Sequence, residues 1–203
     1  MTGKLFIISA PSGAGKTSLA RALIESVSNA QMSISHTTRQ RRSGEIDGKD
    51  YFFVSESEFL EMADQGVFLE HAQVYGNYYA TSRLAVEEML NNGTHVLLDI
   101  DWQGARLVRQ QMPNAVSISI LPPSVEELER RLRGRGSDSD AVIDSRMQQA
   151  SDEMRHCEES DFIVVNDDFN KALHDLTLIL SGESDRLRPL TLDLADLLTG
   201  APS

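Results

Sequence analysis

The sequence predicts an α/β fold with a parallel sheet at its core, and two observations carry this prediction. Short apolar runs of strand type recur at Leu5–Ile8, His95–Ile100, Ala115–Leu121 and Phe162–Val165. Leu5–Ile8 is apolar along its whole length, which is typical of a central parallel strand buried on both faces. Each run is followed by a helical pattern, and this alternation of strand and helix is typical of βαβ units.

The first helix is expected from about Gly15 to Ser28, because apolar residues recur there at helical spacing, at Leu19, Ala22, Leu23 and Val27. A later helix follows Pro122-Pro123. It opens with Ser124 and has Glu127 three residues on, which is the spacing of a capping box. Both helices follow predicted strands directly, so both are expected to pack on the sheet.

The segment Ser33–Arg83 breaks this alternation. It contains three strand-like stretches separated by short glycine turns, at Asp50–Val54, Val67–Tyr75 and Asn77–Thr81. We therefore expect a small, mostly antiparallel insert. Further on, the polar stretch Gly134–Asp140 predicts a mobile loop between two helices. The apolar stretch Leu190–Leu198 predicts either a short packed helix or a partner contact, and packing is favoured.

Composition and charge limit the class of protein. The chain has 203 residues, 40% hydrophobic and 25% charged, as is usual for one compact globular domain. Its 31 acidic and 19 basic side chains give a formal charge of −12, which argues against nucleic-acid binding. No apolar run approaches the ~18 residues of a membrane span. Because Cys157 is the single cysteine and no secretory signal is recognisable, a cytoplasmic setting is expected. A homo-oligomer is compatible with this sequence.

The loop from Ala10 to Thr17, Ala-Pro-Ser-Gly-Ala-Gly-Lys-Thr, lies between the first strand and the first helix. Small residues allow successive backbone N–H groups to converge on phosphate oxygens. Lys16 is placed to reach the β/γ-phosphates, and Thr17 offers a hydroxyl to Mg²⁺. Ala10 stands where the general pattern has its first glycine. The alternative is an ordinary glycine-rich turn, but strand, loop and helix occur in the order that a phosphate-binding loop requires.

Several further runs resemble the motifs of the guanylate kinase family, in family order from roughly residue 5 to residue 180. They are Ser35–Arg42, Gly44-Glu45, Gly48–Tyr51, Gly76–Tyr79, Leu98–Gly104, Leu132–Gly136 and Val165–Asp168. The resemblance implies a P-loop three-layer fold with a parallel sheet core, an inserted, mostly antiparallel GMP-binding subdomain and a mobile lid. It divides a single domain, 1–203, into a core (about 1–32, 84–123 and 160–203), an insert (about 33–83) and a lid (about 124–159).

The resemblance also implies a GMP site. Arg39 and Arg42 would bind the GMP phosphate, and guanidinium groups do pair bidentately with phosphate. Glu70 would read the base, since a carboxylate accepts hydrogen bonds from guanine N1–H and the exocyclic amine together. The other residues of this set are Ser35, Tyr51, Tyr79, Thr81, Asp99 and Asp101. A solvated basic turn is the alternative for the arginines, and a surface carboxylate is the alternative for Glu70.

On the ATP side, the resemblance places Arg131, Arg135 and Arg146 in or beside the lid. Of these, Arg135 and Arg146 would join Lys16, Arg39 and Arg42 in stabilising the transferred phosphoryl group. Asn166 and Asp167 would lie near adenine, although a strand-end turn explains them nearly as well. Arg130 and Arg133 are expected to pair with neighbouring glutamates on an exposed helix face. The implied ATP set is Ser12, Gly13, Ala14, Gly15, Lys16, Thr17, Ser18, Arg131, Asn166 and Asp167, with Mg²⁺ at Thr17.

The sequence thus predicts an enzyme that transfers a phosphoryl group from ATP to GMP, giving ADP and GDP. Two alternatives stay open at this stage. One is a guanylate-kinase-like binding module without catalysis, against which the intact Gly15-Lys16-Thr17 argues. The other is a kinase for another nucleoside monophosphate, against which Ser35, Glu70 and Thr81 argue.

Overall fold

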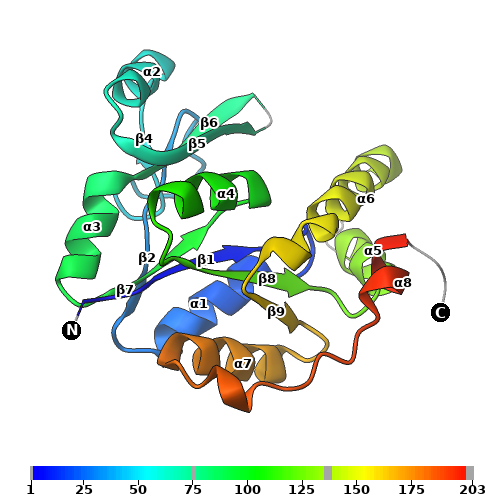
Figure 1. Cartoon of the computed structure of the whole chain (residues 1–203). Helices are drawn as coiled ribbons and strands as arrows, with labels where there is room; N and C mark the ends of the chain where they lie inside the picture. Colours follow the sequence, from blue (N-terminus) through cyan, green and yellow to red (C-terminus); the bar gives the residue numbers. More distant parts are fainter. Residues whose placement is uncertain (1, 75, 135–138, 200–203) are drawn as a thin grey trace. The chain divides into compact units, whose positions relative to one another are not determined.

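The computed structural model describes residues 2–74, 76–134 and 139–199 of the chain (Figure 1). The chain divides into two compact units. Unit 1 consists of Met1–Leu5 and Asn29–Ala115, and unit 2 of Phe6–Ser28 and Val116–Ser203.

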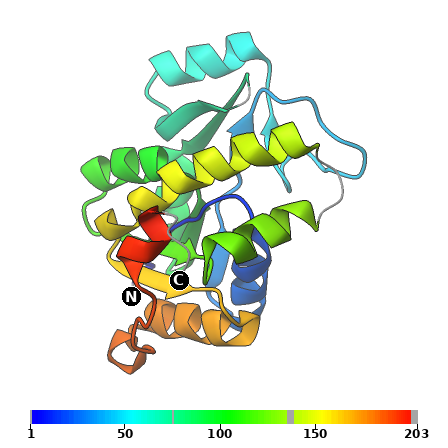
Figure 2. The same ribbon diagram turned by 90° about the vertical axis from the view of Figure 1, so that its right-hand side faces the viewer.

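Unit 2 is built on three parallel strands in the order β1-β8-β9, namely β1 (Leu5–Ser9), β8 (Val116–Leu121) and β9 (Phe162–Val165). In their register Phe6 lies opposite Val116, and Ile118 lies opposite Phe162. Leu5–Ile8 of β1, Ile118, Ile120 and Leu121 of β8, and Val164 of β9 are buried. The burial of Leu5–Ile8 on both faces explains the continuous apolar run of β1. Helices α1 (Lys16–Ser26) and α7 (Phe169–Ser181) lie side by side next to the strands (Figures 1 and 2).

Three further helices of unit 2 share an apolar cluster (Figure 2). They are α5 (Val125–Arg133), α6 (Asp140–Arg155) and α8 (Leu194–Thr199). Leu128 and Leu132 of α5, Ile143 and Met154 of α6 and Leu197 of α8 are buried in this cluster. Short 3-10 helices at Cys157–Glu159 and Ser184–Arg186 follow α6 and α7.

Unit 1 contains a second pair of parallel strands, β2 (Ala30–Met32) and β7 (His95–Asp99). Helix α3 (Arg83–Asn91) precedes β7 in the chain, and α4 (Trp102–Gln111) follows it. Val86 of α3 and Val108 of α4 are fully buried, so each helix turns an apolar face inward.

The rest of unit 1 is a mixed sheet in the order β4-β3-β6-β5. Its strands are β3 (His36–Thr37), β4 (Phe52–Phe53), β5 (Phe68–Val74) and β6 (Asn77–Ser82). Helix α2 (Glu56–Asp64) begins at a capping box formed by Ser55 and Glu58. Phe59 of this helix is fully buried against Phe68 and Ala80, which attaches α2 to the sheet.

The structure confirms the four predicted parallel strands and the helix after the phosphate-binding loop. In the described residues β2 pairs parallel with β7 in unit 1, and β1, β8 and β9 pair parallel in unit 2, so the α/β class with a parallel core is confirmed. Leu197 is buried against α5 and α6, which confirms packing for the C-terminal apolar stretch. None of the described helices combines the length and the apolar character that a membrane-spanning segment requires.

Two sequence expectations needed correction. The insert is mostly antiparallel as expected, since β3–β6 and β5–β6 pair antiparallel. It also contains α2 and the short strand β3, neither of which was predicted, and its β3–β4 pairing is parallel. At α5 only half of the predicted capping box is present. The Ser124 hydroxyl accepts from the Glu127 N–H at 3.2 Å, but the Glu127 carboxylate bonds Arg130 and Arg131 instead. Two guanidinium groups provide stronger, charge-assisted donors than one backbone amide.

Tyr75 and residues 135–138 of the predicted loop lie outside the described residues.

Candidate nucleotide-binding sites

The glycine-rich loop of unit 2 connects β1 to α1. Gly13 and Gly15 have φ angles of 98° and 95°, a left-handed conformation that L side chains rarely adopt. Gly15 is the N-cap of α1 and provides no side-chain hydrogen bond to its first turn. The first turn of a helix carries backbone N–H groups that suit an anion, and in α1 this turn contains Lys16, Thr17 and Ser18.

Side chains from other elements pack tightly against this loop. The Asn166 amide nitrogen donates to the Ala14 carbonyl at 2.7 Å, and Asn166 is only 6% exposed. A Cβ on Gly15 would lie 2.5 Å from that same amide nitrogen. A Cβ on Gly13 would lie 2.9 Å from a Leu128 methyl carbon. The loop therefore needs glycine at both positions for space as well as for backbone conformation.

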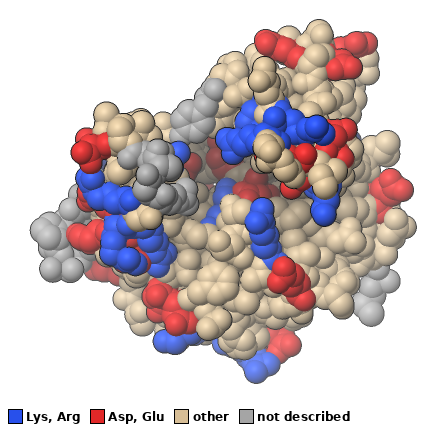
Figure 3. Space-filling view, turned by 180° about the vertical axis from the view of Figure 1, so that it is seen from behind, with Lys and Arg blue, Asp and Glu red and all other residues tan. Residues whose placement is uncertain are grey.

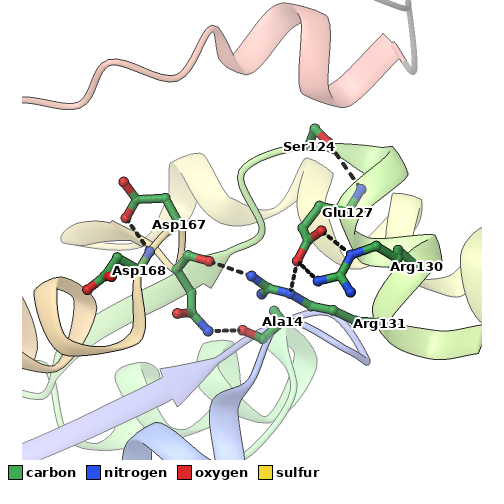
Figure 4. A network of polar contacts seen from close by, with 8 residues as sticks. Ala14, Ser124, Glu127, Arg130, Arg131, Asp167 and Asp168 are labelled. Atoms are coloured by element: carbon green, nitrogen blue, oxygen red, sulfur yellow. Dashed lines mark hydrogen bonds and ion pairs between the residues drawn. The ribbon is translucent and has the colours of Figure 1, made fainter. Parts of the chain in front are cut away.

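Arg131 joins α5 to the residue that braces the loop (Figure 4). Its guanidinium donates to the Glu127 carboxylate at 2.7 Å and to the Asn166 carbonyl at 2.9 Å. Arg130 also donates to Glu127, and the hydrogen bonds from the two arginines lower the pKa of this carboxyl to about 2. Arg133 pairs with Glu129, so the pairing expected for Arg130 and Arg133 is confirmed.

The remaining predicted ATP-side residues lie elsewhere in unit 2. Asp167 directly follows Asn166, and its carboxylate accepts from Arg188 at 3.0 Å and from the Asp168 N–H at 2.8 Å. Arg146 is half-buried on α6. Arg135 lies outside the described residues.

In unit 1 a buried carboxylate stands opposite a buried hydroxyl. Glu70 on β5 pairs in register with Thr81 on β6, beside an irregularity in the strand pairing. The Thr81 hydroxyl donates to Glu70 Oε1 at 2.7 Å, and these residues are 6% and 1% exposed. Burial raises the pKa of Glu70 to about 7, with the negative charge of Asp101 acting in the same direction and the Thr81 hydrogen bond opposing it. This carboxylate can accept further hydrogen bonds.

The other oxygen of Glu70 faces α4. A Cβ on Gly104 would lie 3.2 Å from Glu70 Oε2, so glycine leaves space there. Asp101 is the N-cap of α4, where its carboxylate accepts from the Gly104 N–H at 2.8 Å. Asp99 ends β7, two residues earlier. Ser35 lies in the segment before β3, and its carbonyl accepts from the Phe52 N–H at 2.9 Å.

The predicted phosphate-binding arginines are held together by Glu45. The Arg39 guanidinium donates to both carboxylate oxygens of Glu45, at 2.7 and 3.1 Å. The backbone N–H of Arg42 donates to the same carboxylate at 2.7 Å. Hydrogen bonds from Arg39 and Arg42 hold the pKa of Glu45 below its ordinary value. The Glu45 carboxylate therefore pairs with the Arg39 guanidinium in the bidentate geometry that a guanidinium also offers to a phosphate.

Aromatic rings surround Arg39. Its guanidinium carbon lies 5.4 Å from the centroid of the Tyr51 ring and 5.8 Å from that of Phe53. The Tyr51 and Tyr79 rings meet edge to face at 6.1 Å. Burial raises the pKa of Tyr51, so its hydroxyl stays protonated and can donate at neutral pH. Unit 1 thus brings Arg39, Tyr51 and Tyr79 together, as the resemblance implied.

Local ion pairs explain how an acidic protein accommodates its groups of arginines. On the face drawn in Figure 3, basic side chains gather in groups and acidic side chains lie next to them. Arg39 pairs with Glu45 and Arg131 with Glu127, each at 2.7 Å. Among these carboxylates, sequence reasoning gave no role to Glu45, although Gly44-Glu45 belonged to the family motifs. Glu127 was predicted as part of a capping box and among the glutamates that pair with exposed arginines of the same helix. Arg188 was missed because nothing local marks it.

The fold and these residues define a nucleotide-binding protein with a phosphate-binding loop. The sequence model of the family described as "Guanylate kinase" matches residues 2–183. The guanylate kinase of Yersinia pestis bv. Antiqua is 59% identical over 187 residues, covering 91% of this chain and 90% of that protein. The guanylate kinase of Escherichia coli K12 is 57% identical over the same shares. The chain therefore belongs to the guanylate kinase family.

A solved structure supports the same assignment. The crystal structure of guanylate kinase from Anaplasma phagocytophilum matches with a TM-score of 0.73 at 38% identity. The match covers 90% of this chain and 87% of that one. The family resemblance that the motifs indicated is thus confirmed over most of the chain.

Proposed function

We propose that this protein transfers the γ-phosphoryl group of ATP to GMP, forming ADP and GDP. The observation that carries the choice of acceptor is the buried Glu70, paired with the Thr81 hydroxyl at 2.7 Å. Ionised Glu70 accepts hydrogen bonds from guanine N1–H and the exocyclic amine. Adenine lacks this pair of donors, and an unpaired buried carboxylate is costly, so discrimination of ~10⁴ against AMP is expected.

The other acceptor-side residues support binding of the GMP phosphate. Arg39 and Arg42 would supply positive charge, and the hydroxyls of Tyr51 and Tyr79 would donate hydrogen bonds. Ser35 would contribute a hydroxyl to GMP binding. Asp99 and Asp101 lie at the carboxyl end of β7 and just after it, where α/β proteins place ligand-binding side chains. We assign GMP binding to this set and to the proposed insert of about residues 33–83.

The donor-side residues support binding of ATP by the loop from Ser12 to Ser18. Lys16 would neutralise charge on the β/γ-phosphates. Thr17 is exposed in the first turn of α1, and its hydroxyl is an oxygen ligand of the kind that Mg²⁺ prefers. Bound Mg²⁺ would supply charge neutralisation at the phosphates. We assign the adenine side to Arg131, Asn166 and Asp167.

Catalysis in this proposal is mainly positioning and charge stabilisation. The transition state of phosphoryl transfer carries negative charge on its equatorial oxygens. Lys16, Arg39, Arg42, Arg135 and Arg146 would stabilise that charge, with Arg135 and Arg146 in a lid of about residues 124–159. The core would comprise about residues 1–32, 84–123 and 160–203. We also infer a cytoplasmic setting, which the single, buried Cys157 supports.

The test is ADP formation from ATP with GMP, AMP, UMP or dTMP in parallel. GMP should be the preferred acceptor, and Lys16→Ala should lose most of the turnover while keeping its thermal stability. Lys171→Ala, which removes an exposed lysine of unit 2, is the charge-matched control and should behave as wild type. Turnover of AMP at a similar kcat/KM to GMP would overturn the assignment. Binding of GMP without any turnover would favour a non-catalytic binding module.

A further inference from the structure

Arg188 lies after α7, beyond the residues 2–183 that the family model matches. Its guanidinium makes three kinds of contact. Nε donates to Asp175 Oδ2 at 2.7 Å, Nη1 donates to Asp167 Oδ1 at 3.0 Å, and Nη2 donates to the Val165 carbonyl at 3.2 Å. One side chain therefore connects α7, the end of β9 and Asp167, one of the residues assigned to the adenine side.

Asp175 anchors this arginine to the interior of unit 2. The residue is only 5% exposed on α7, and its Oδ1 is buried without a hydrogen-bond partner in the described part of the chain. A buried carboxylate is costly unless it is paired with a cation. The ion pair with Asp175 therefore fixes the position of Arg188, and the rigid planar fork directs its other nitrogens at Val165 and Asp167.

A second arginine, Arg131, also binds the segment that Arg188 contacts. Arg131 of α5 donates to the Asn166 carbonyl at 2.9 Å. The Asn166 amide in turn donates to the Ala14 carbonyl of the phosphate-binding loop at 2.7 Å. Residues 165–167 thus receive hydrogen bonds from two guanidinium groups and pass one on to the loop. Displacement of this segment would disturb both the loop and the Asp167 carboxylate.

We infer that Arg188 is a positioning residue for the ATP side of the site, because it fixes the segment 165–167. This inference rests on the proposed function. A carboxylate at Asp167 can accept a hydrogen bond from the exocyclic amine of adenine. Hypoxanthine has a carbonyl at that place and offers no such donor. Loss of Arg188 should therefore weaken ATP binding and reduce the preference for ATP over ITP, while GMP binding stays unchanged.

The experiment must separate positioning from stability, since Arg188→Ala also leaves the Asp175 charge buried and unpaired. We therefore compare Arg188→Ala with the double variant Asp175→Asn/Arg188→Ala, which removes that charge. Arg186→Ala is the matched control, because Arg186 is an exposed arginine two residues away that pairs with Glu183. Steady-state kinetics gives KM for ATP, ITP and GMP and kcat, and Tm is measured without nucleotide.

Both Arg188 variants should raise the KM for ATP about tenfold, as expected for lost charged hydrogen bonds, and lower the ATP/ITP preference. The KM for GMP should not change. The double variant should have a higher Tm than Arg188→Ala but the same raised KM for ATP. A double variant with wild-type KM for ATP and wild-type ATP/ITP preference would overturn the inference, because Arg188 would then act on stability alone.

A measurement of ATP binding tests the role of Arg188 independently of the proposed function. Titration with a fluorescent N-methylanthraniloyl ATP, without GMP, reports the ATP side alone. Wild-type protein that binds this probe but does not phosphorylate GMP would refute the proposed function, while about tenfold weaker probe binding by the double variant would still support the role of Arg188. Equal probe binding by the wild type and the double variant would refute that role.

Discussion

At the residue scale, Glu70 is expected to make GMP binding depend on pH. Burial raises its pKa to about 7, and the carboxylate must be ionised to accept both guanine donors. We expect the KM for GMP to rise as the pH falls below about 7, with about a tenfold rise per unit well below the pKa. The KM for ATP should not follow this profile. Parallel measurement of both constants between about pH 5.5 and 8.5 tests this, and a flat GMP profile would contradict the buried, protonatable carboxyl.

The same residue should also affect stability. The folded protein keeps the Glu70 proton up to pH about 7, whereas an unperturbed glutamate releases it near 4.5. The free energy of unfolding contributed by this group therefore falls as the pH rises from about 4.5 to about 7. Glu70→Gln removes this cost and still accepts from Thr81, so it should be more stable than wild type by about 3 kcal/mol above pH 7. Urea unfolding at about pH 8 and pH 4.5 should show the difference only at the higher pH.

Glu45 is expected to affect GMP binding through its contact with Arg39. Its carboxylate accepts both guanidinium bonds of Arg39 and the Arg42 N–H. We expect Glu45→Gln to raise the KM for GMP about three- to tenfold, because Arg39 loses the charge-assisted bond that orders it beside Tyr51. Glu61→Gln, an exposed carboxylate on α2, is the control. A lower KM for GMP would show instead that Glu45 competes with the phosphate.

At the scale of structural elements, two glycines with positive φ allow a matched comparison. Gly15 has φ 95°, and an added Cβ would lie 2.5 Å from the Asn166 amide nitrogen that holds Ala14. Gly66, between α2 and β5, has φ 69° with nothing within 4 Å of an added Cβ. Both alanine variants should lose about 1 to 2 kcal/mol of unfolding free energy from backbone strain.

The two variants should differ in function. Only Gly15→Ala should raise the KM for ATP, by about tenfold or more, because Asn166 must move and break its bond to the loop. Chemical denaturation combined with steady-state kinetics measures both effects. Equal KM values for ATP in the two variants would mean that the close approach of Asn166 has no part in shaping the phosphate-binding loop.

The same elements show what the sequence could predict and why. The strand Leu5–Ser9 was predictable because Leu5–Ile8 are all buried, so its apolar run is continuous. Helix α2 was not predicted, because Phe59 is its only fully buried residue and Leu60 is 45% exposed. Its N-terminal signal, Ser55 and Glu58, was nevertheless present in the sequence. Weakly amphipathic helices attached by one ring give little periodic signal.

The candidate sites likewise contain parts that the sequence could predict and parts that it could not. The phosphate-binding loop is local in sequence, so its spacing alone predicted it. The contact of Asn166 with Ala14 spans 152 positions, and that of Arg188 with Asp167 spans 21. Such contacts depend on how strands and helices pack, and no local pattern encodes them. Family motifs located residues such as Asn166 but gave no indication that its amide braces the loop.

At the scale of the whole molecule, the described donor-side residues and acceptor-side residues fall in different units. Ser12–Ser18, Arg131, Asn166 and Asp167 belong to unit 2, whereas Arg39, Tyr51, Glu70 and Thr81 belong to unit 1. Each nucleotide bound alone should therefore stabilise chiefly the unit that binds it, by mass action on local opening. Variants on one side should likewise change the KM of one nucleotide and leave the other unchanged.

Hydrogen exchange followed by mass spectrometry tests this division. With GMP alone, peptides from β5, β6 and the Arg39–Tyr51 segment should gain protection. With a non-hydrolysable ATP analogue alone, peptides from residues 10–20 and 163–168 should gain protection instead. Glu70→Gln should remove most of the first pattern and keep the second, and Lys16→Ala should do the reverse, because each substitution affects only one ligand's contacts. Protection of residues 10–20 by GMP alone, as strong as by the ATP analogue, would contradict the assignment of the two nucleotides to separate units.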